Sequence, residues 1–264
     1  MRRIYIPKPD STDKRPLTIP NPRDKIIMKS MATVLEDIFE PIFLPCSHGF
    51  RPGCHTVFLE MLENWKGTRT IVNADVVKCF DNISHTRLLD QLRRYIDDEP
   101  FLRLMDKMIK VSIEDEDGND LSNKEKGIPQ GARISPLMMN VYLHSLDEEI
   151  YRMMEKNSEI RYVRYADDCT VGLLSRSKTQ AETICSVISS YIGEELGLRI
   201  KYEIETVSTI ILGVRLRLPD HKDEEIRLEA PKERIMKRLK QRGFLPDPPR
   251  NGDSVSWGQR IMRL

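Results

Sequence analysis

The chain has 264 residues and a net charge of only +1, with 39% hydrophobic and 31% charged residues. This balance excludes a disordered chain and fits one large globular domain or two smaller ones. The chain has no run near the ~20 apolar residues of a membrane span, no apolar signal segment at its start, and five irregularly spaced cysteines. We therefore expect an intracellular protein, in an organelle such as the mitochondrion or in bacterial cytoplasm, that is not secreted and has no membrane partner.

Basic side chains are concentrated in two segments. Residues 1–29 carry eight basic and three acidic side chains, and residues 232–242 carry six basic and one acidic. The rest of the chain is acidic overall. Basic ends around an acidic middle suit a cleft that grips phosphate at its rim and holds metal at its floor. Basic helix faces exposed to solvent account for the same pattern equally well.

The first predicted elements are a hairpin and a long helix. Strand-forming residues on both sides of a polar turn predict a hairpin over residues 3–20. Asn21 and Pro22 are typical of a helix start, and Pro41 lies just beyond the expected helix end. The expected buried stripe of this helix consists of residues at helical spacing: Met31, Val34, Leu35, Ile38 and Phe39.

The remaining elements alternate between strands and helices. We expect a strand around Asp75, helices near 84–95 and 99–110, and an acidic loop over 114–120. A helix from Ser135, a hairpin over 162–171, a helix over 177–196 stopped by Gly197, and strands near 199–205 and 209–217 follow. A basic helix is predicted at 231–242. This order indicates an α+β fold in which an antiparallel sheet is backed by helices.

Two adjacent carboxylates, Asp167 and Asp168, lie at the tip of the hairpin over 162–171. Alone they are a weak signal, because Asp-Asp is also common in turns. Asp75 lies inside another predicted strand, where a buried, isolated carboxylate is costly unless it is paired or binds a cation. Together, the three acids could hold two Mg²⁺ ions roughly 4 Å apart, which can serve the attacking and leaving oxygens in nucleotidyl transfer.

A set of short segments then stands out by its order along the chain, over about residues 3–217. The segments are Ile6-Pro7-Lys8-Pro9, Lys14-Arg15-Pro16-Leu17 with Ile19-Pro20, Ser47-His48-Gly49-Phe50-Arg51-Pro52-Gly53, Ala74-Asp75 with Phe80-Asp81-Asn82-Ile83, Gly127-Ile128-Pro129-Gln130-Gly131 with Ile134-Ser135-Pro136-Leu137, Arg164-Tyr165-Ala166-Asp167-Asp168, and Leu212-Gly213. Each segment is of modest specificity, but the ordered set is highly specific. In this order they resemble the reverse transcriptase domain of group II intron-encoded proteins (maturases).

The resemblance implies a right-hand polymerase fold of the α+β class, with fingers and palm, an antiparallel palm sheet backed by helices, and a partial helical thumb or maturase segment. Residues 1–70 would form partial fingers, without the N-terminal extension of the family, and residues 71–219 the palm with some fingers elements. Residues 220–264 would begin a thumb or maturase region that is truncated.

The resemblance also assigns roles to residues near the three acids. Asp75, Asp167 and Asp168 would be catalytic residues that hold two Mg²⁺ ions, with Asp75 and Asp167 as the main ligands and Asp168 as the third acid of the cluster. Phe80 would lie under the incoming sugar and disfavour a 2′-OH. The alternative for Phe80 is a plain core aromatic.

Five further residues would bind substrate or template. Gln130 and Gly131 would line the nucleotide pocket and let the backbone approach the substrate closely. Lys8 and Arg15 would neutralise the triphosphate, with solvated charge as the alternative. Arg51 would contact template or simply brace the palm.

The implied function is RNA-templated DNA synthesis by two-metal nucleotidyl transfer, combined with intron RNA binding and splicing assistance. The implied partners are intron or template RNA, a primer–template duplex, a deoxynucleoside triphosphate and a separate chain that supplies the missing thumb or maturase part. The alternative is a degenerate or split maturase-derived protein that acts as a non-catalytic RNA-binding or scaffold component of a ribonucleoprotein complex.

Overall fold

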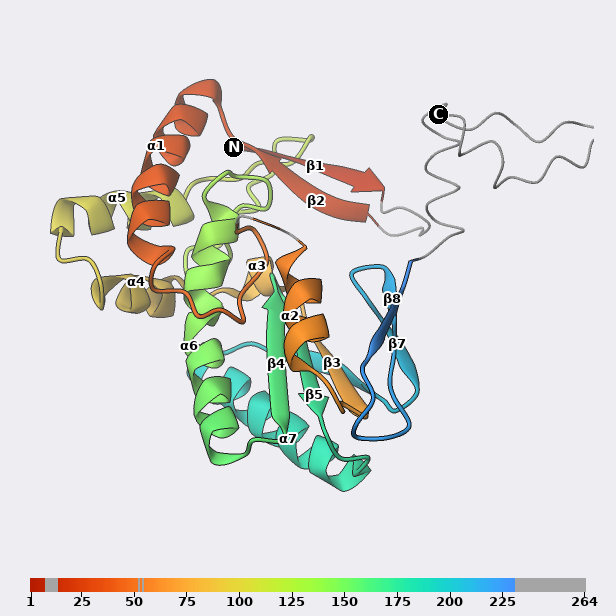
Figure 1. Ribbon diagram of the computed structural model, residues 1–264. Coiled ribbons are helices and arrows are strands. Elements are labelled where there is room, and N and C mark those ends of the chain that lie inside the picture. Colours follow the sequence, from red (N-terminus) through yellow and green to blue (C-terminus); the bar gives the residue numbers. More distant parts are fainter. Residues whose placement is uncertain (8–13, 52, 54, 231–264) are drawn as a thin grey trace, which may run out of the picture.

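A four-stranded antiparallel sheet lies at the centre of the molecule (Figure 1). The structure, a computed structural model, describes residues 1–7, 14–51, 53 and 55–230. The strands of this sheet, in spatial order, are β4 (Ile160–Tyr165), β5 (Asp168–Leu173), β3 (Thr70–Val76) and β6 (Ile200–Glu205). Alternate residues of β3 point to opposite faces, so that Val72 joins a larger apolar cluster and Ile71 a smaller one. The sheet is therefore covered on both faces.

Helices cover the face with the larger cluster. α6 (Ser135–Lys156) packs against β4, and α7 (Lys178–Tyr191) packs against β3 and β6. α1 (Pro22–Phe39) and α4 (His85–Arg93) pack on α6, and α5 (Glu99–Ile109) packs on α4. α7 continues into a π-helical turn over Ile192–Leu196 and ends at Gly197, whose φ of +64° suits a glycine.

The opposite face is covered by α2 (Thr56–Asn64) and a second sheet. This three-stranded sheet consists of β7 (Ser208–Ile211), β8 (Val214–Arg217) and β9 (Arg227–Glu229). The smaller apolar cluster, which includes the fully buried Trp65, joins α2 and this sheet to the central one. The predicted boundary after residue 219 thus falls within one sheet, because β9 pairs with β8.

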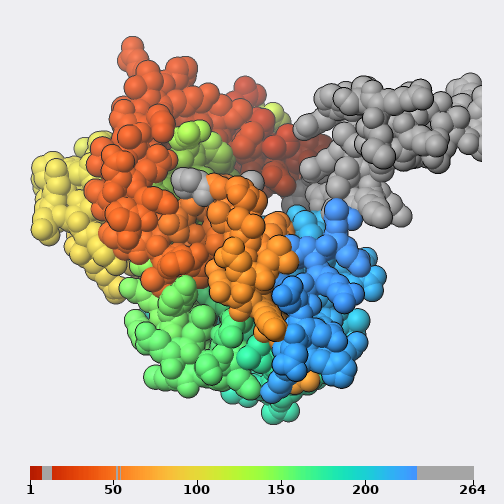
Figure 2. All heavy atoms as spheres, in the orientation of Figure 1, coloured from red at the N-terminus to blue at the C-terminus, as the bar shows by residue number. Residues whose placement is uncertain are grey.

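The N-terminal hairpin, β1 (Arg2–Pro7) and β2 (Lys14–Ile19), lies beside α1 at the top of the view in Figure 1. The Thr18 amide donates to the Gln130 carbonyl at 2.5 Å, which fixes β2 over the loop that precedes α6. A short helix, α3 (Cys79–Asn82), follows β3. In Figure 2 the hairpin and α1 (red) form the upper surface, with α2 (orange) at the centre and β7 to β9 (blue) beside it.

The predicted α+β class, the N-terminal hairpin and the helices within residues 1–230 are confirmed. Two predictions are wrong. Val34 is 48% exposed, because α1 packs through Met31, Leu35 and Phe39 and Val34 lies at the edge of that stripe. The single strand expected over 209–217 is instead β7 and β8, because Leu212 and Gly213 adopt positive φ and turn the chain.

Some elements of the structure differ from the prediction or lie beyond what the structure describes. The elements α2, α3 and β9 were not predicted from the sequence, and the basic helix predicted at 231–242 lies outside the described residues. Within the described part of the chain, no helix combines the length and the apolar character that a membrane crossing requires.

The difference between Leu35 and Val34 gives a direct stability test. Leu35→Ala is expected to lower the free energy of unfolding by about 3 kcal/mol, because it leaves a cavity at a fully buried position. Val34→Ala, one residue away on the same helix, should change it by less than about 0.5 kcal/mol. Urea denaturation of both variants measures this. Equal losses would mean that α1 is not packed as described.

Candidate active site

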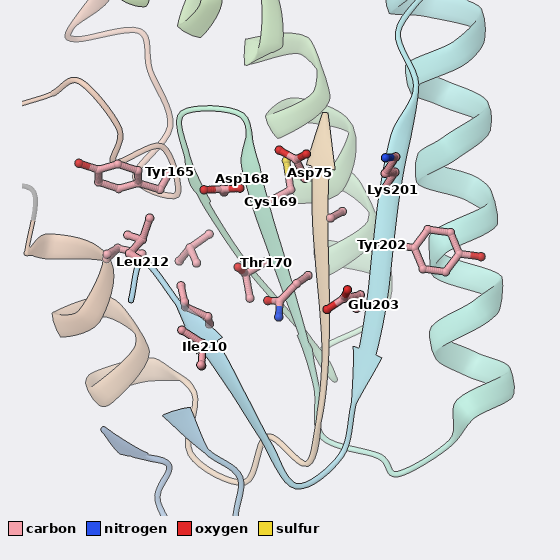
Figure 3. Close-up of a pocket in the computed structure, with 15 residues that line it drawn as sticks. Asp75, Tyr165, Asp168, Cys169, Thr170, Lys201, Tyr202, Glu203, Ile210 and Leu212 are labelled. Carbon is pink, nitrogen blue, oxygen red and sulfur yellow. The ribbon is translucent and has the colours of Figure 1, made fainter. Parts of the chain in front are cut away.

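Two of the predicted acids lie side by side where the two inner strands of the central sheet, β3 and β5, end and begin (Figure 3). Asp75, near the end of β3, pairs in register with Asp168, the first residue of β5, and on its other side with Lys201 of β6. Directly opposed residues on antiparallel strands have Cβ atoms about 4.5–5.5 Å apart. Asp168, Asp75 and Lys201 therefore form a row across three strands on one face of the sheet.

The third predicted acid, Asp167, lies in the turn between β4 and β5 and is partly buried. Its carbonyl accepts a hydrogen bond from the Val76 amide at 3.3 Å, so the turn is joined to the end of β3. Asp75 and Asp168 are exposed. The expectation that Asp75 is buried is therefore wrong, because β3 ends one residue later and the side chain opens into a cavity.

Neighbouring carboxylate charges disfavour the ionisation of Asp167 and Asp168. Although Asp168 is open to water on one side, the protein around it, together with the charges of Asp167 and Asp75, raises the pKa of Asp168 to about 6. Burial and the charge of Asp75 likewise raise the pKa of Asp167. A cation placed among these groups relieves their repulsion and favours their charged forms.

The donor set fits Mg²⁺, because carboxylate oxygens are its preferred protein ligands. Among the described residues, no three His, Cys, Asp or Glu side chains are grouped closely enough to hold a metal ion together. Mg²⁺ does not need such a group, since it keeps several waters and is usually held by one or two carboxylates plus substrate phosphates. Asp75 and Asp168, with Asp167 beside them, are the residues that would hold it.

The row of acids borders a cavity of about 540 Å³. The same cavity has an apolar wall from α2, β4, β7 and the turn after β7: Val57, Val163, Ile210, Ile211 and Leu212. Tyr165 and Lys201 also line it. Neither Lys201 nor this wall was singled out from the sequence, because only the pairing of β6 with β3 and the fold-back of β7 bring them to the acids.

The predicted nucleotide-side residues converge on a second cavity of about 920 Å³. The cavity is lined by Arg15 of the hairpin strand β2 and by Phe80 of α3. Gln130 and Gly131 line it from the loop before α6. Phe80 also packs against the larger apolar cluster, so it is both a core aromatic and part of the cavity wall. Lys8 lies outside the described residues.

Gly131 is required at its position by a close approach of β2. Its φ is +104°, and a Cβ atom there would lie 2.5 Å from Leu17 Cδ1 and 2.9 Å from the Thr18 carbonyl oxygen. The backbone that approaches Gly131 most closely is thus the hairpin itself. Gln130 Nε2 donates to Asp81 Oδ1 at 3.5 Å, which holds the amide beside Phe80.

Arg51 braces the structure, one of the two roles considered for it. Its guanidinium donates to both carboxylate oxygens of Glu40, at 3.0 and 3.1 Å from Nε. It also donates to the Leu44 and Ser47 carbonyls at 3.0 and 2.7 Å. Through these hydrogen bonds Arg51 fixes the loop between α1 and α2 to the end of α1.

His48, in the same loop, makes folding sensitive to acid. Burial, together with the charges of Arg51 and Arg164, lowers the pKa of His48 from 6.5 to about 4. The unfolded chain therefore takes up a proton below about pH 6.5 that the folded chain does not take up until about pH 4. Stability from this group is complete above pH 6.5 and is lost as the pH falls through that range.

We expect this group to reduce the free energy of unfolding by at most about 2 kcal/mol between pH 7 and pH 5. Urea denaturation at both pH values should show a smaller acid-dependent loss for His48→Gln than for the wild type. Substitution of the exposed His221 by Gln serves as the control and should retain the wild-type loss. An identical loss in the wild type and His48→Gln would contradict the assignment.

Comparisons with known proteins identify the family of this chain and support its fold. Residues 6–214 match the family model described as reverse transcriptase (RNA-dependent DNA polymerase). The chain is 38% identical over 177 residues to the 91 kDa protein in the cob intron of Schizosaccharomyces pombe, covering 62% of this chain and 22% of that protein. It is 37% identical over 163 residues to the group II intron-encoded protein LtrA of Lactococcus lactis subsp. cremoris, covering 59% and 26%. The chain thus spans about a quarter of the length of these relatives.

The fold is similar to that of a solved telomerase from Candida tropicalis in complex with a fragment of telomeric RNA. The TM-score is 0.65, at 11% sequence identity, and the match covers 91% of this chain and 48% of the telomerase chain. At that identity the likeness shows the fold alone, which is the predicted right-hand polymerase arrangement of fingers and palm. The chain therefore belongs to the reverse transcriptase family, in the group of group II intron-encoded proteins.

Proposed function

We propose that this chain is the catalytic fingers and palm of a group II intron reverse transcriptase/maturase, which extends a primer on an RNA template by two-metal nucleotidyl transfer. The pairing of Asp75 with Asp168, with Asp167 in the adjoining turn, carries this proposal. Their mutual repulsion makes this end of the sheet a place that favours cations. The fingers would comprise residues 1–70, the palm residues 71–219 together with β9, which pairs with β8, and the start of a thumb or maturase region the residues after β9.

Each residue then has a separate task. Asp75, Asp167 and Asp168 would hold two Mg²⁺ ions, which when bound activate the primer 3′-OH and stabilise the pyrophosphate that leaves. Arg15, together with Lys8, would bind the triphosphate. Catalysis by such a site is mostly positioning and electrostatic stabilisation.

The remaining residues would select and orient the nucleotide. Phe80 would lie under its sugar and exclude a 2′-OH, and Gln130 would contact it from the loop before α6. The cavity beside the acids, with one charged and one apolar wall, suits the primer end, since a nucleotide presents both phosphate and apolar ring faces. Contacts to the duplex would be with its backbone and 2′-OH groups.

The whole protein would also bind intron RNA and assist its splicing, in an organelle such as the mitochondrion or in bacterial cytoplasm. A separate chain that supplies the thumb or maturase part is one of its proposed partners.

Primer extension on an RNA template with Mg²⁺ and all four deoxynucleotides tests the proposal. We expect extension by the chain, alone or with a partner chain that supplies the thumb part, and loss of extension on adding EDTA. RNA binding without extension in every combination would contradict the enzyme and favour the non-catalytic scaffold.

A further inference from the structure

Arg164, the residue before Tyr165-Ala166-Asp167-Asp168, is completely buried on the inner side of β4. A guanidinium has five N–H donors, and in Arg164 all of them are used. Nε donates to Asp147 Oδ1 at 2.8 Å and Nη2 to Asp147 Oδ2 at 2.5 Å. The remaining donors of Nη1 and Nη2 bind Asn140 Oδ1, the Ala166 carbonyl and Ser47 Oγ, each at 2.9 Å.

The partner of Arg164 is equally buried and equally well satisfied. Asp147 of α6 has no exposed side-chain surface, and it also accepts a hydrogen bond from the Tyr162 hydroxyl at 2.9 Å. A fully buried ion pair is weak as a source of stability, because removing both charges from water offsets their attraction. Stability alone therefore gives a poor reason for a charged pair at this position.

One hydrogen bond of Arg164 reaches the turn that leads to Asp167 and Asp168. Ala166 has a φ of +60°, which is uncommon for a residue with a Cβ atom and costs free energy unless the surroundings hold it. Arg164 Nη1 binds the carbonyl of this same residue. The bond closes the turn from the inside, only two residues away from Arg164 in the chain.

Gly49, in the loop between α1 and α2, packs closely against the backbone of the same turn. A Cβ atom on Gly49 would lie 2.1 Å from the Ala166 amide nitrogen, so only glycine fits there. Asn140 Nδ2 donates to the Gly49 carbonyl at 2.8 Å while its Oδ1 accepts from Arg164. The network thus runs from Arg164 through Asn140 to Gly49 and back to the Ala166 backbone.

We propose that Arg164 is a positioning residue: with Asp147 and Asn140 it holds the Ala166 turn in its left-handed conformation and so places Asp167 and Asp168 against Asp75. The role in metal binding rests on the proposed function, whereas the holding of the turn does not. Lysine could keep the charge opposite Asp147, but its three donors on one nitrogen cannot serve four acceptor residues at once.

The test uses the double variant Asp147→Leu/Arg164→Met, which removes the charged pair without leaving an unpaired buried charge. Gly49→Ala disturbs the same turn from the outside and keeps every donor of Arg164. Arg161→Lys is the matched control: Arg161 lies on the same strand, and its side chain binds the Asn64 and Ser158 carbonyls instead. Circular dichroism and thermal melting establish that each full-length variant is folded.

Two measurements follow on folded protein. Hydrogen exchange of the amides of residues 165–168 should be faster in the double variant and in Gly49→Ala, with no matching change in β3. Mn²⁺ binding, measured by electron paramagnetic resonance without nucleotide, should weaken about 10–100-fold, as is typical when residues behind metal ligands are altered. Arg161→Lys should match the wild type in both.

Unchanged exchange at residues 165–168 in a folded double variant would overturn the inference. Wild-type Mn²⁺ affinity in both variants would also overturn it. The Mn²⁺ site is identified as the one at which the Asp168→Asn variant no longer binds the ion. These results are separate from the proposed function. A wild-type chain that binds Mn²⁺ at this site but never extends a primer would refute the polymerase and leave the role of Arg164 intact.

Discussion

Replacing Asp75 or Asp168 by asparagine is expected to lower the rate of RNA-templated primer extension at least about a thousandfold. A neutral amide cannot supply the charge that holds Mg²⁺, and a divalent ion contributes several kcal/mol to stabilising the transition state. Each ~1.4 kcal/mol corresponds to a factor of ten in rate. Single-turnover incorporation of one deoxynucleotide, at saturating RNA–primer duplex, measures the loss.

The Asp168 substitution should leave the fold as stable as before, or more stable. Asp168 lies directly opposite Asp75, and the charges of Asp167 and Asp75 both raise its pKa, so a neutral side chain at Asp168 removes repulsion between like charges. We expect an unchanged or higher melting temperature for Asp168→Asn in metal-free buffer. Asp117→Asn, in the exposed acidic loop, is the control and should alter neither rate nor melting. A lower melting temperature together with lost activity would indicate that these acids support the fold and not the chemistry.

The second large effect concerns the stability of the buried pair. Arg164→Met alone and Asp147→Leu alone are each expected to lower the free energy of unfolding by about 3–5 kcal/mol, because each leaves a buried charge without its partner. The double variant should recover most of this loss. Urea denaturation of the four proteins gives the coupling energy between the two residues.

The exposed pair of Arg176 and Asp220 provides a matched comparison. Arg176 Nη2 and Asp220 Oδ1 lie 2.7 Å apart, but both side chains are exposed to solvent. Arg176→Met should change the free energy of unfolding by less than about 1 kcal/mol. Equal costs for Arg164→Met and Arg176→Met, or a double variant no more stable than either single one, would contradict the burial argument.

Local signals identified most of the elements correctly. Asn21 and Pro22 marked the start of α1, and Ser177 and Gly197 bounded α7 with its final π turn. Such signals depend only on neighbouring residues, so they are readable from the chain. Val34 shows the limit: its spacing fits the helical stripe, but which part of a stripe is buried depends on where α6 lies.

The residues of the candidate site likewise fall into those identified from the sequence and those identified only in the structure. Asp75, Asp167 and Asp168 were recognised because strand-forming residues surround them and the ordered segments resemble one family. Lys201 was missed, since its place opposite Asp75 follows from the pairing of β6 with β3 across more than a hundred residues. Arg164 belonged to a recognised segment, yet four of its five hydrogen bonds depend on α6 and on the loop before α2.

By itself, therefore, the sequence determined the class of fold, most of the elements, the family and the three candidate acids, because local periodicity and short ordered segments carry that information. Only the tertiary structure decided that Asp75 opens into a cavity, that Gly131 accommodates β2, and that the Ala166 turn is held by Arg164 and Gly49. These facts depend on strand register and on contacts between residues far apart in the chain. Such contacts are set by how the sheet, α6 and the loops pack together, which no local pattern specifies.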